Sequence, residues 1–200
     1  TGACWPGLTQ ELAVYQASIG NPPVEFGESF VVTGQQPALF TGPLYTVYKI
    51  ATAIRLAKEI SKCHGICCTP VFWQGSDDHD FEEARSATVL TKNHEPLTLT
   101  YEPMHDVAGL PMYRVPLDNS AHDLVDRAAD ATPGSEFRDE VRAFLHGSLS
   151  AASSLADWSA RIIARLFAGS GLVVFTSECR SARQAARDII KKEIYEPLIG

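Results

Sequence analysis

A dense group of acidic residues with a single histidine follows a short apolar run. Residues 77–83 read Asp-Asp-His-Asp-Phe-Glu-Glu. Histidine exchanges protons near neutral pH, and carboxylates bind cations and accept hydrogen bonds. The run therefore suits acid–base chemistry, or the binding of sugar hydroxyls, an ammonium group or a divalent ion. The alternative is a helix N-terminus whose acidic side chains complement the helix dipole, and the sequence leaves both interpretations open.

A second segment, residues 33–49, combines small residues with hydroxyl, amide and amino groups. Gly34 and Gly42 permit close approach of the backbone, and the unpaired N–H groups of the helix that follows suit an anion. Lys49 falls within the first two turns of that helix, where its amine could reach a phosphate or a carboxylate. Hydroxyl groups come from Thr41, Tyr45 and Thr46. An ordinary strand-to-helix turn would look similar, and the segment has neither the glycine-rich dinucleotide fingerprint nor the Walker motif.

Three of the five cysteines, Cys63, Cys67 and Cys68, crowd around His64. No second pair of cysteines or histidines follows at the spacing of a zinc site, so we expect buried neutral thiols and no bound metal. The odd number of cysteines favours reduced thiols, and hence a cytoplasmic protein. The other histidines of this sequence are predicted to be isolated surface or capping residues: His94, His105, His122 and His146.

Composition narrows the class of protein. The 200 residues are 45% hydrophobic and 20% charged, which is typical of one globular domain or two small ones. The net charge of -7 makes the chain a poor binder of phosphate backbones, so we expect no nucleic-acid partner. No apolar run approaches the roughly 20 residues that a membrane span needs, so we expect no membrane partner either.

The elements that must position these motifs form a strand–helix–strand unit. Residues 30–33 predict a buried strand, a helix is expected from Pro43 to about Lys62, and residues 70–74 predict a second buried strand. Such a unit implies a parallel sheet, in which ligands bind beyond the carboxyl ends of the strands. Both chemical motifs follow predicted strands at that edge. Trp73, near the end of the second strand, indicates a core residue, although ligand stacking stays open.

The middle of the chain has a different character. A hairpin is expected from residues 87–91 and 97–101, and another strand at residues 113–117. Three helices and a late buried strand follow, at residues 120–130, 134–149, 153–168 and 171–176. The last helix starts at about Ser181, and Arg180, Arg183 and Arg187 are predicted to form a solvated face of it.

These expectations divide the chain into four parts. Residues 1–29 form a helical lead-in, and residues 30–86 form the first part of the sheet core. Residues 87–152 are an inserted hairpin and helical segment, and residues 153–200 return to the core. The chain starts at Thr1 and its last segment begins like a helix, so we expect a piece of a longer protein.

Three segments together resemble the family of bacillithiol biosynthesis cysteine-adding enzymes: Val32–Lys49, Pro70–Glu83 and Arg165–Phe175. The resemblance implies an α/β fold with a Rossmann-like, nucleotidyltransferase-type parallel sheet, related to class I aminoacyl-tRNA synthetases. Where those synthetases carry His-Ile-Gly-His, this sequence has Gly42-Pro43-Leu44-Tyr45. It also has Thr176-Ser177 where the family often has Asp-Pro.

The resemblance implies a ligase that joins the carboxylate of L-cysteine to the amine of glucosaminyl-malate. Family members are longer and form homodimers through a coiled coil. An amide bond requires an activated carboxylate, and ATP with magnesium is one candidate for the activator. The alternatives are a catalytically inactive Rossmann-like module that binds a nucleotide or a sugar and, from the residues alone, a metal-dependent hydrolase that uses the acidic cluster.

The resemblance also supplies candidate site residues. The expected cradle for substrate or nucleotide consists of Thr33, Gly34, Gln35, Gln36, Thr41, Gly42 and Tyr45. Lys49 is expected to hold a phosphate or the malyl carboxylate. The sugar or the cysteine ammonium is assigned to Asp77, Asp78, His79 and Asp80, with Trp73 among the binding residues. The expected catalytic residues are His79, as the acid or base, with Asp78 and Lys49.

Overall fold

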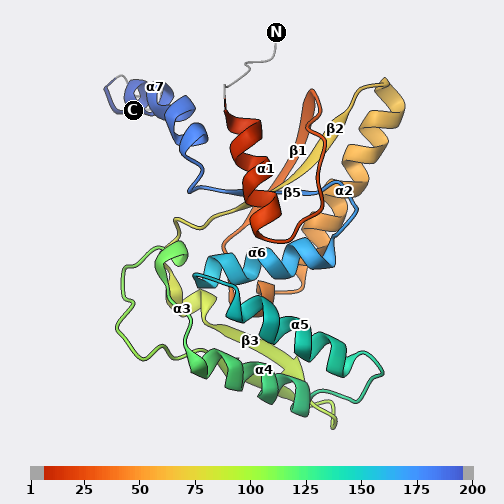
Figure 1. The fold of residues 1–200 in the computed structure, drawn as a ribbon, viewed down its shortest axis with the longest axis vertical. Coiled ribbons are helices and arrows are strands. Elements are labelled where there is room, and N and C mark those ends of the chain that lie inside the picture. The colour runs from red at the N-terminus through yellow and green to blue at the C-terminus, as the bar shows by residue number, and fades with distance from the viewer. Residues whose placement is uncertain (1–6, 196–200) are drawn as a thin grey trace.

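The computed structural model describes residues 7–195, so Cys4 and the last five residues lie outside the described part. The elements appear in Figure 1 in chain order. The helices are α1 (Leu8–Ser18), α2 (Tyr45–His64), α3 (Phe81–Ala84), α4 (Asn119–Ala131), α5 (Arg138–Ser150), α6 (Leu155–Leu166) and α7 (Arg180–Tyr195). The strands are β1 (Ser29–Gln35), β2 (Cys68–Gln74), β3 (Ser86–Leu90), β4 (Pro96–Thr100) and β5 (Val173–Thr176). Short 3₁₀ turns lie at Leu39–Thr41 and Met112–Arg114.

A three-stranded parallel sheet forms the upper part of the molecule in Figure 1. Its strand order is β1-β2-β5, and Gln35 of β1 lies opposite Gln74 of β2. The connecting helices α2 and α6 share one core against the sheet, built from Ile50, Ile54, Phe72, Ala160, Ile163, Ala164, Leu172 and Val174 with Ile19. This arrangement confirms the predicted α/β class and the parallel strand–helix–strand unit.

Helix α2 follows the expected pattern closely. Its buried stripe recurs at steps of three and four residues and contains Thr46, Ile50, Ala53, Ile54 and Ala57. The helix begins at Tyr45, two residues after the expected Pro43, and ends at His64. Gly65 closes it in the left-handed conformation (φ 64°), where its N–H donates to the carbonyl oxygen of Ser61 at 3.0 Å.

The prediction that β1 is buried was wrong. Phe30 and Val32 are 54% and 58% exposed, because β1 lies at the edge of the sheet and only one of its faces is covered by helices. Trp73 of β2 is also 49% exposed, and its ring packs on Phe175 of β5 at a centroid distance of 4.7 Å. Its assignment to the core was therefore wrong, and a large aromatic surface stays accessible.

Side-chain amides occupy the opposite edge of the sheet. The Gln16 side chain is 1% exposed and pairs with both backbone groups of Val174: its Nε2 donates to the carbonyl oxygen at 2.7 Å, and its Oε1 accepts from the N–H at 3.0 Å. Asn21 adds a bond from Nδ2 to the carbonyl oxygen of Leu172 at 2.9 Å. The end of α1 thus takes the place of a fourth strand beside β5.

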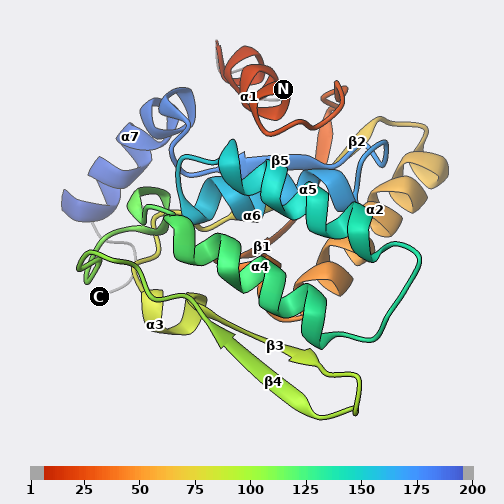
Figure 2. The ribbon, with the colours of Figure 1, turned by 60° about the horizontal axis from the view of Figure 1, so that its bottom comes forward.

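The inserted segment builds a second core below the sheet (Figure 2). Strands β3 and β4 pair antiparallel, which confirms the predicted hairpin, and α4 and α5 pack above it. Buried side chains of this core include Leu99, Tyr101, Met112, Val115, Leu124 and Val125. The strand expected at residues 113–117 was wrong, because a 3₁₀ turn occupies Met112–Arg114 and the chain then runs to the N-cap of α4 at Asp118.

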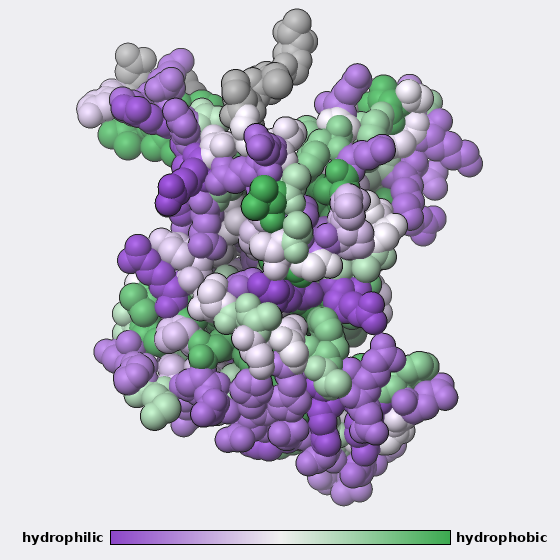
Figure 3. Space-filling view, viewed as in Figure 1, coloured by the Kyte–Doolittle hydropathy of each residue, from purple (hydrophilic) through white to green (hydrophobic). Residues whose placement is uncertain are grey.

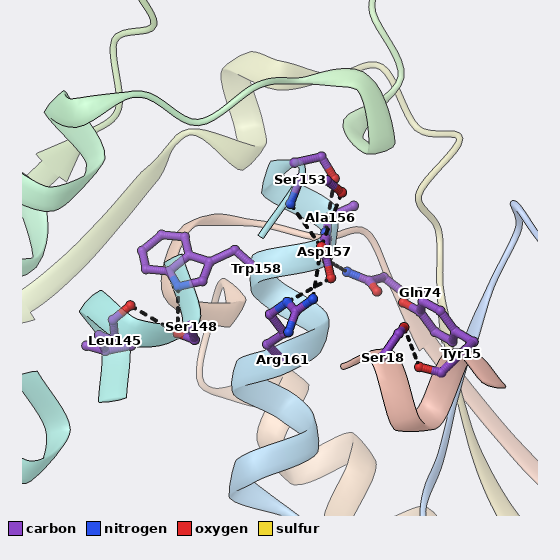
Figure 4. A network of polar contacts seen from close by, with 11 residues as sticks. Tyr15, Ser18, Gln74, Leu145, Ser148, Ser153, Ala156, Asp157, Trp158 and Arg161 are labelled. Atoms are coloured by element: carbon purple, nitrogen blue, oxygen red, sulfur yellow. Dashed lines mark hydrogen bonds and ion pairs between the residues drawn. The ribbon is translucent and has the colours of Figure 1, made fainter. Parts of the chain in front are cut away.

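Helix α6 contributes to both cores. Trp158 and Ile162 belong to the core of the inserted segment, whereas Ala160 and Ile163 belong to the core of the sheet. Figure 4 shows the polar contacts that fix this helix. Trp158 Nε1 donates to Ser148 Oγ of α5 at 3.0 Å. The described helices include none long and apolar enough to cross a membrane.

Replacing Gln16 by Leu, which has a similar size but no polar atoms, should leave two buried backbone groups of Val174 without partners. We expect a loss of about 2–4 kcal/mol in the free energy of unfolding, measured by urea denaturation. The matched control is Gln10→Leu on the exposed side of the same helix, which should change stability by less than about 0.5 kcal/mol. Equal losses in the two variants would show that the amide pairing does not stabilise the sheet edge.

Glu11 fixes the start of α7 from α1. Its carboxylate accepts the Ser181 and Arg180 N–H groups, both at 2.8 Å, and these bonds, the Ser181 bond foremost, lower the pKa of Glu11 from 4.5 to about 2. The stabilisation is therefore complete above pH 4.5 and is lost as the pH falls toward 2. At pH 6, Glu11→Gln should speed amide hydrogen exchange in the first turn of α7 about fivefold, the equivalent of about 1 kcal/mol for a helix cap. The difference from wild type should shrink toward pH 2, while Glu59→Gln on exposed α2 should have no effect at either pH.

Candidate functional site

The ends of β1 and β2 bring the two sequence motifs together at the carboxyl edge of the sheet. A Cβ atom on Gly34 would lie 2.8 Å from the carbonyl oxygen of Trp73, so glycine is required there by the close approach of the strands. Beyond the strands, the Gly75 N–H donates to the carbonyl oxygen of Gln35 at 3.0 Å, and Gln36 lies beside Gly75. Residues 34–36 and 73–75 therefore form one continuous ledge at this edge.

Lys49 points back from α2 to this ledge. Its Nζ donates to the carbonyl oxygen of Gly34 at 2.5 Å and to Gln35 Oε1 at 3.3 Å, and it lies 5.4 Å from the centre of the Tyr45 ring. Among the described residues no carboxylate lies within 4 Å of this amine. The structure thus places Gly34, Gln35, Tyr45 and Lys49 together, with a positive charge that an anionic group can neutralise.

The start of α2 has one unpaired hydroxyl, three residues before Lys49. No side chain caps the helix at Leu44, and the hydroxyl of Thr46 is buried without a hydrogen-bond partner. A hydroxyl and a nearby lysine at the start of a helix are together typical of sites for phosphate or carboxylate groups. This set fits a phosphate of ATP or a substrate carboxylate.

The turn that leads into α2 carries unusual backbone angles. Phe40, Thr41 and Gly42 have φ angles of 50°, 74° and 77°, and Gly42 has ψ at -154°, a conformation reached almost only by glycine. A β-branched residue such as Thr41 is rare at positive φ. Packing holds the turn in place, because Thr41 is 6% exposed and the Phe40 ring lies 5.5 Å from that of Trp158. The strained turn thus fixes the entry to α2 beside the ledge.

Within the acidic run, Asp77 forms an ion pair with a residue far away in the sequence. Arg183 Nη2 lies 2.7 Å from Asp77 Oδ1, and Arg183 Nε donates to the carbonyl oxygen of Ser177 at 2.5 Å. Arg180, Arg183 and Arg187 are exposed, which confirms the predicted solvated face, but Arg183 also pairs with Asp77 there. No local pattern indicates this pair, because the two residues are 106 positions apart.

Asp78 and Asp80 stabilise the local turn. Asp78 Oδ1 accepts the Asp80 N–H at 2.9 Å, and Asp80 Oδ1 accepts the Glu83 N–H at 3.1 Å as the N-cap of α3. The helix-start interpretation of the acidic run thus holds for Asp80. His79 and Asp80 also line a hollow of about 360 Å³ with Pro103 and residues 105–109, and this hollow does not include Lys49.

Two further polar residues at this edge escaped the sequence analysis. Ser76 is fully buried, and its hydroxyl lies 3.0 Å from that of Thr176 and 2.7 Å from that of Ser177, which ties the end of β2 to the end of β5. Desolvation, with the charges of Asp157 and Asp77, raises the pKa of the neighbouring Glu178 above its usual range. Neither residue belongs to a local motif, and only the sheet topology brings them to the site.

The remaining cysteine and histidine predictions were partly wrong. Cys68 is buried as expected, but Cys63 and Cys67 are exposed free thiols. His122 and His146 are not isolated: their Nδ1 atoms lie 2.7 Å apart, with the rings stacked between α4 and α5. Residues 7–195 contain no group of three or more histidine, cysteine, aspartate or glutamate side chains placed to hold a metal ion.

Most of the chain is similar to known proteins. The family model described as "Bacillithiol biosynthesis BshC, N-terminal Rossmann-like domain" matches residues 26–198. A protein of Salinibacter ruber named "Putative cysteine ligase BshC" is 38% identical over 167 residues, which cover 84% of this chain and 30% of that protein. A protein of the same name from Natranaerobius thermophilus is 37% identical over 82% of this chain and 30% of its own length. The chain thus spans about three tenths of these relatives.

The strain at Thr41 can be measured by comparing two substitutions that remove its side chain. At an ordinary helical or extended position, alanine is more stable than glycine by about 0.5–1 kcal/mol. At the left-handed Thr41 the order should reverse, with Thr41→Gly more stable than Thr41→Ala by about 1 kcal/mol in urea denaturation. Ser170→Gly and Ser170→Ala in the loop before β5 provide the comparison at a residue without positive φ. If alanine is the more stable residue at position 41, the turn is not strained.

Proposed function

The chain belongs to the bacillithiol biosynthesis BshC family, whose N-terminal Rossmann-like domain it matches. From this membership we propose that it functions as part of a cysteine ligase. The proposed reaction joins the carboxylate of L-cysteine to the amine of glucosaminyl-malate in bacillithiol biosynthesis. The observation that carries the proposal is the match over residues 26–198, together with relatives that are named as cysteine ligases. Those names favour a ligase over an inactive binding module.

The proposed chemistry forms one carbon–nitrogen bond. The neutral amine of glucosaminyl-malate attacks the carboxyl carbon of cysteine, one carboxyl oxygen leaves, and the amine loses a proton. A carboxylate oxygen is a poor leaving group, so the carboxylate must first be activated. We propose ATP with magnesium as the co-substrate that takes up this oxygen on phosphorus. Lys49 and the start of α2 are the residues suited to hold its phosphate groups.

Lys49 and His79 contact different parts of the chain, so the proposal gives them separate tasks. Lys49 binds an anionic group, a phosphate or the malyl carboxylate, against the ledge formed by Gln35 and its neighbours. His79, with Asp78, takes the proton of the attacking amine from the hollow beside α3. The half-exposed face of Trp73 is available for stacking against the sugar ring.

The proposal extends to the setting of the reaction. We infer small-molecule substrates, a cytoplasmic location and a homodimeric complete enzyme. The proposal also keeps Thr33, Gln36 and Thr41 in the cradle for substrate or nucleotide.

The experiment is mass spectrometry of a reaction that contains the full-length protein, L-cysteine and glucosaminyl-malate. The reaction is run with and without ATP and magnesium. We expect the cysteinyl adduct, and its dependence on ATP identifies the activator. Folded protein that yields no adduct under either condition would contradict the ligase proposal.

Variants in the same reaction test the roles of the residues. His79→Ala should lower kcat about 100-fold or more, because a positioned acid or base contributes that much. Lys49→Met should chiefly raise KM for the substrate whose anion it binds. His64→Ala, at the exposed end of α2, is the control and should leave both constants unchanged. Unchanged turnover of His79→Ala and Asp78→Ala would remove these residues from the mechanism.

A further inference from the structure

A cavity of about 690 Å³ lies in the inserted segment, between β3, α4, α5 and the turn that precedes α2. Its walls are mainly apolar and include Phe40, Leu44, Val89, Val125, Val141 and Leu145. The volume falls in the range that holds small organic ligands. The surface over this lower part of the molecule is mainly hydrophilic in Figure 3, so the apolar walls contrast with their surroundings.

Two arginines of α5 line this cavity, and they differ in their partners. Arg142 pairs with Asp130 and has Nε 3.5 Å from Asp126 Oδ1, so carboxylates of α4 already neutralise its charge. Arg138 donates from Nη2 to the carbonyl oxygen of Thr132 at 3.0 Å, and its Nε, like that of Arg142, is buried without a hydrogen-bond partner. Within residues 7–195 no carboxylate lies within 4 Å of Arg138. The cavity wall therefore contains one guanidinium whose charge is not compensated.

We propose that this cavity binds a small apolar monocarboxylate, with its hydrocarbon part on the aliphatic walls and its carboxylate on Arg138. A guanidinium matches a carboxylate in shape and charge. A neutral apolar molecule would leave the charge of Arg138 uncompensated. A polyanion would bring more negative charge than the single uncompensated arginine can balance. The proposal is independent of the ligase reaction.

The location of the cavity allows a bound ligand to influence the candidate site through the turn that precedes α2. The strained turn forms part of the wall through Phe40, Gly42, Pro43 and Leu44, and the next residue is Tyr45 at the start of α2. A ligand seated against this turn would hold the backbone conformation that places Tyr45 and Lys49. Occupation of the cavity should therefore stabilise the entry to α2.

Octanoate and 1-octanol are suitable probes, because they share a hydrocarbon chain and differ in the charged group. Titration of this chain, followed by NMR of its methyl groups, should shift Val89, Val125, Val141 and Leu145, with octanoate binding about tenfold more tightly than octanol. Arg138→Gln should remove the preference for octanoate. Arg187→Gln, an exposed arginine of α7, is the matched control and should retain it.

A variant that fills the cavity, Ala128→Trp, should abolish the binding of both probes. The wild-type shift map keeps the proposal testable if this variant does not fold. Octanoate shifts at methyl groups away from the cavity would overturn the proposal. Equal affinities for the two probes in wild-type protein, or an unchanged preference in Arg138→Gln, would also overturn it.

Discussion

The burial of α6 between two cores is the constraint on which the rest of the structure depends. Eight of its 12 residues are buried, which leaves almost no face for solvent. Its alanines allow α6 to approach the sheet closely, while Trp158 on another side anchors the inserted segment through Ser148. A helix shared in this way fixes the two cores relative to each other. It also reaches the candidate site, because Gln74 Nε2 at the end of β2 donates to the carbonyl oxygen of Ala156 at 2.8 Å (Figure 4).

Much of this fold could be predicted because its elements carry strong local signals. The apolar stripe of α2, the β-branched runs and the turn residues of the hairpin each indicate an element without reference to the rest of the chain. Exposure could not be predicted in the same way. Val32 and Trp73 look like core residues, but they lie on the face of the sheet opposite to Phe72, against which α2 and α6 pack. Residues 113–117 show the opposite error, since a strand pattern without a neighbouring strand to pair with becomes a turn.

The candidate site likewise contains residues that a local sequence pattern indicates and residues that only the tertiary structure brings there. Lys49 and Gln35 could be placed together because both belong to one strand–turn–helix segment. Arg183, Ser76 and Glu178 could not, because β5 and α7 meet the end of β2 only through the order of the strands. Several motif residues also have structural roles that the sequence does not separate from chemistry. Gly34 permits two strands to approach, and Asp80 caps a helix, whatever either residue does for a ligand.

The side-chain amides at the end of α1 restrict the addition of a further strand to one edge of the sheet. With Gln16 and Asn21 bound to β5, that side cannot accept another strand without first releasing buried hydrogen bonds. The outer edge of β1 has no strand beside it among the described residues, so any β-segment that extends the sheet meets a lower barrier there. A segment added in parallel would end next to Gln35 and Lys49. Addition of a strand at the β1 edge would thus create a new wall of the candidate site. The amides on β5 prevent a strand from pairing at the other edge.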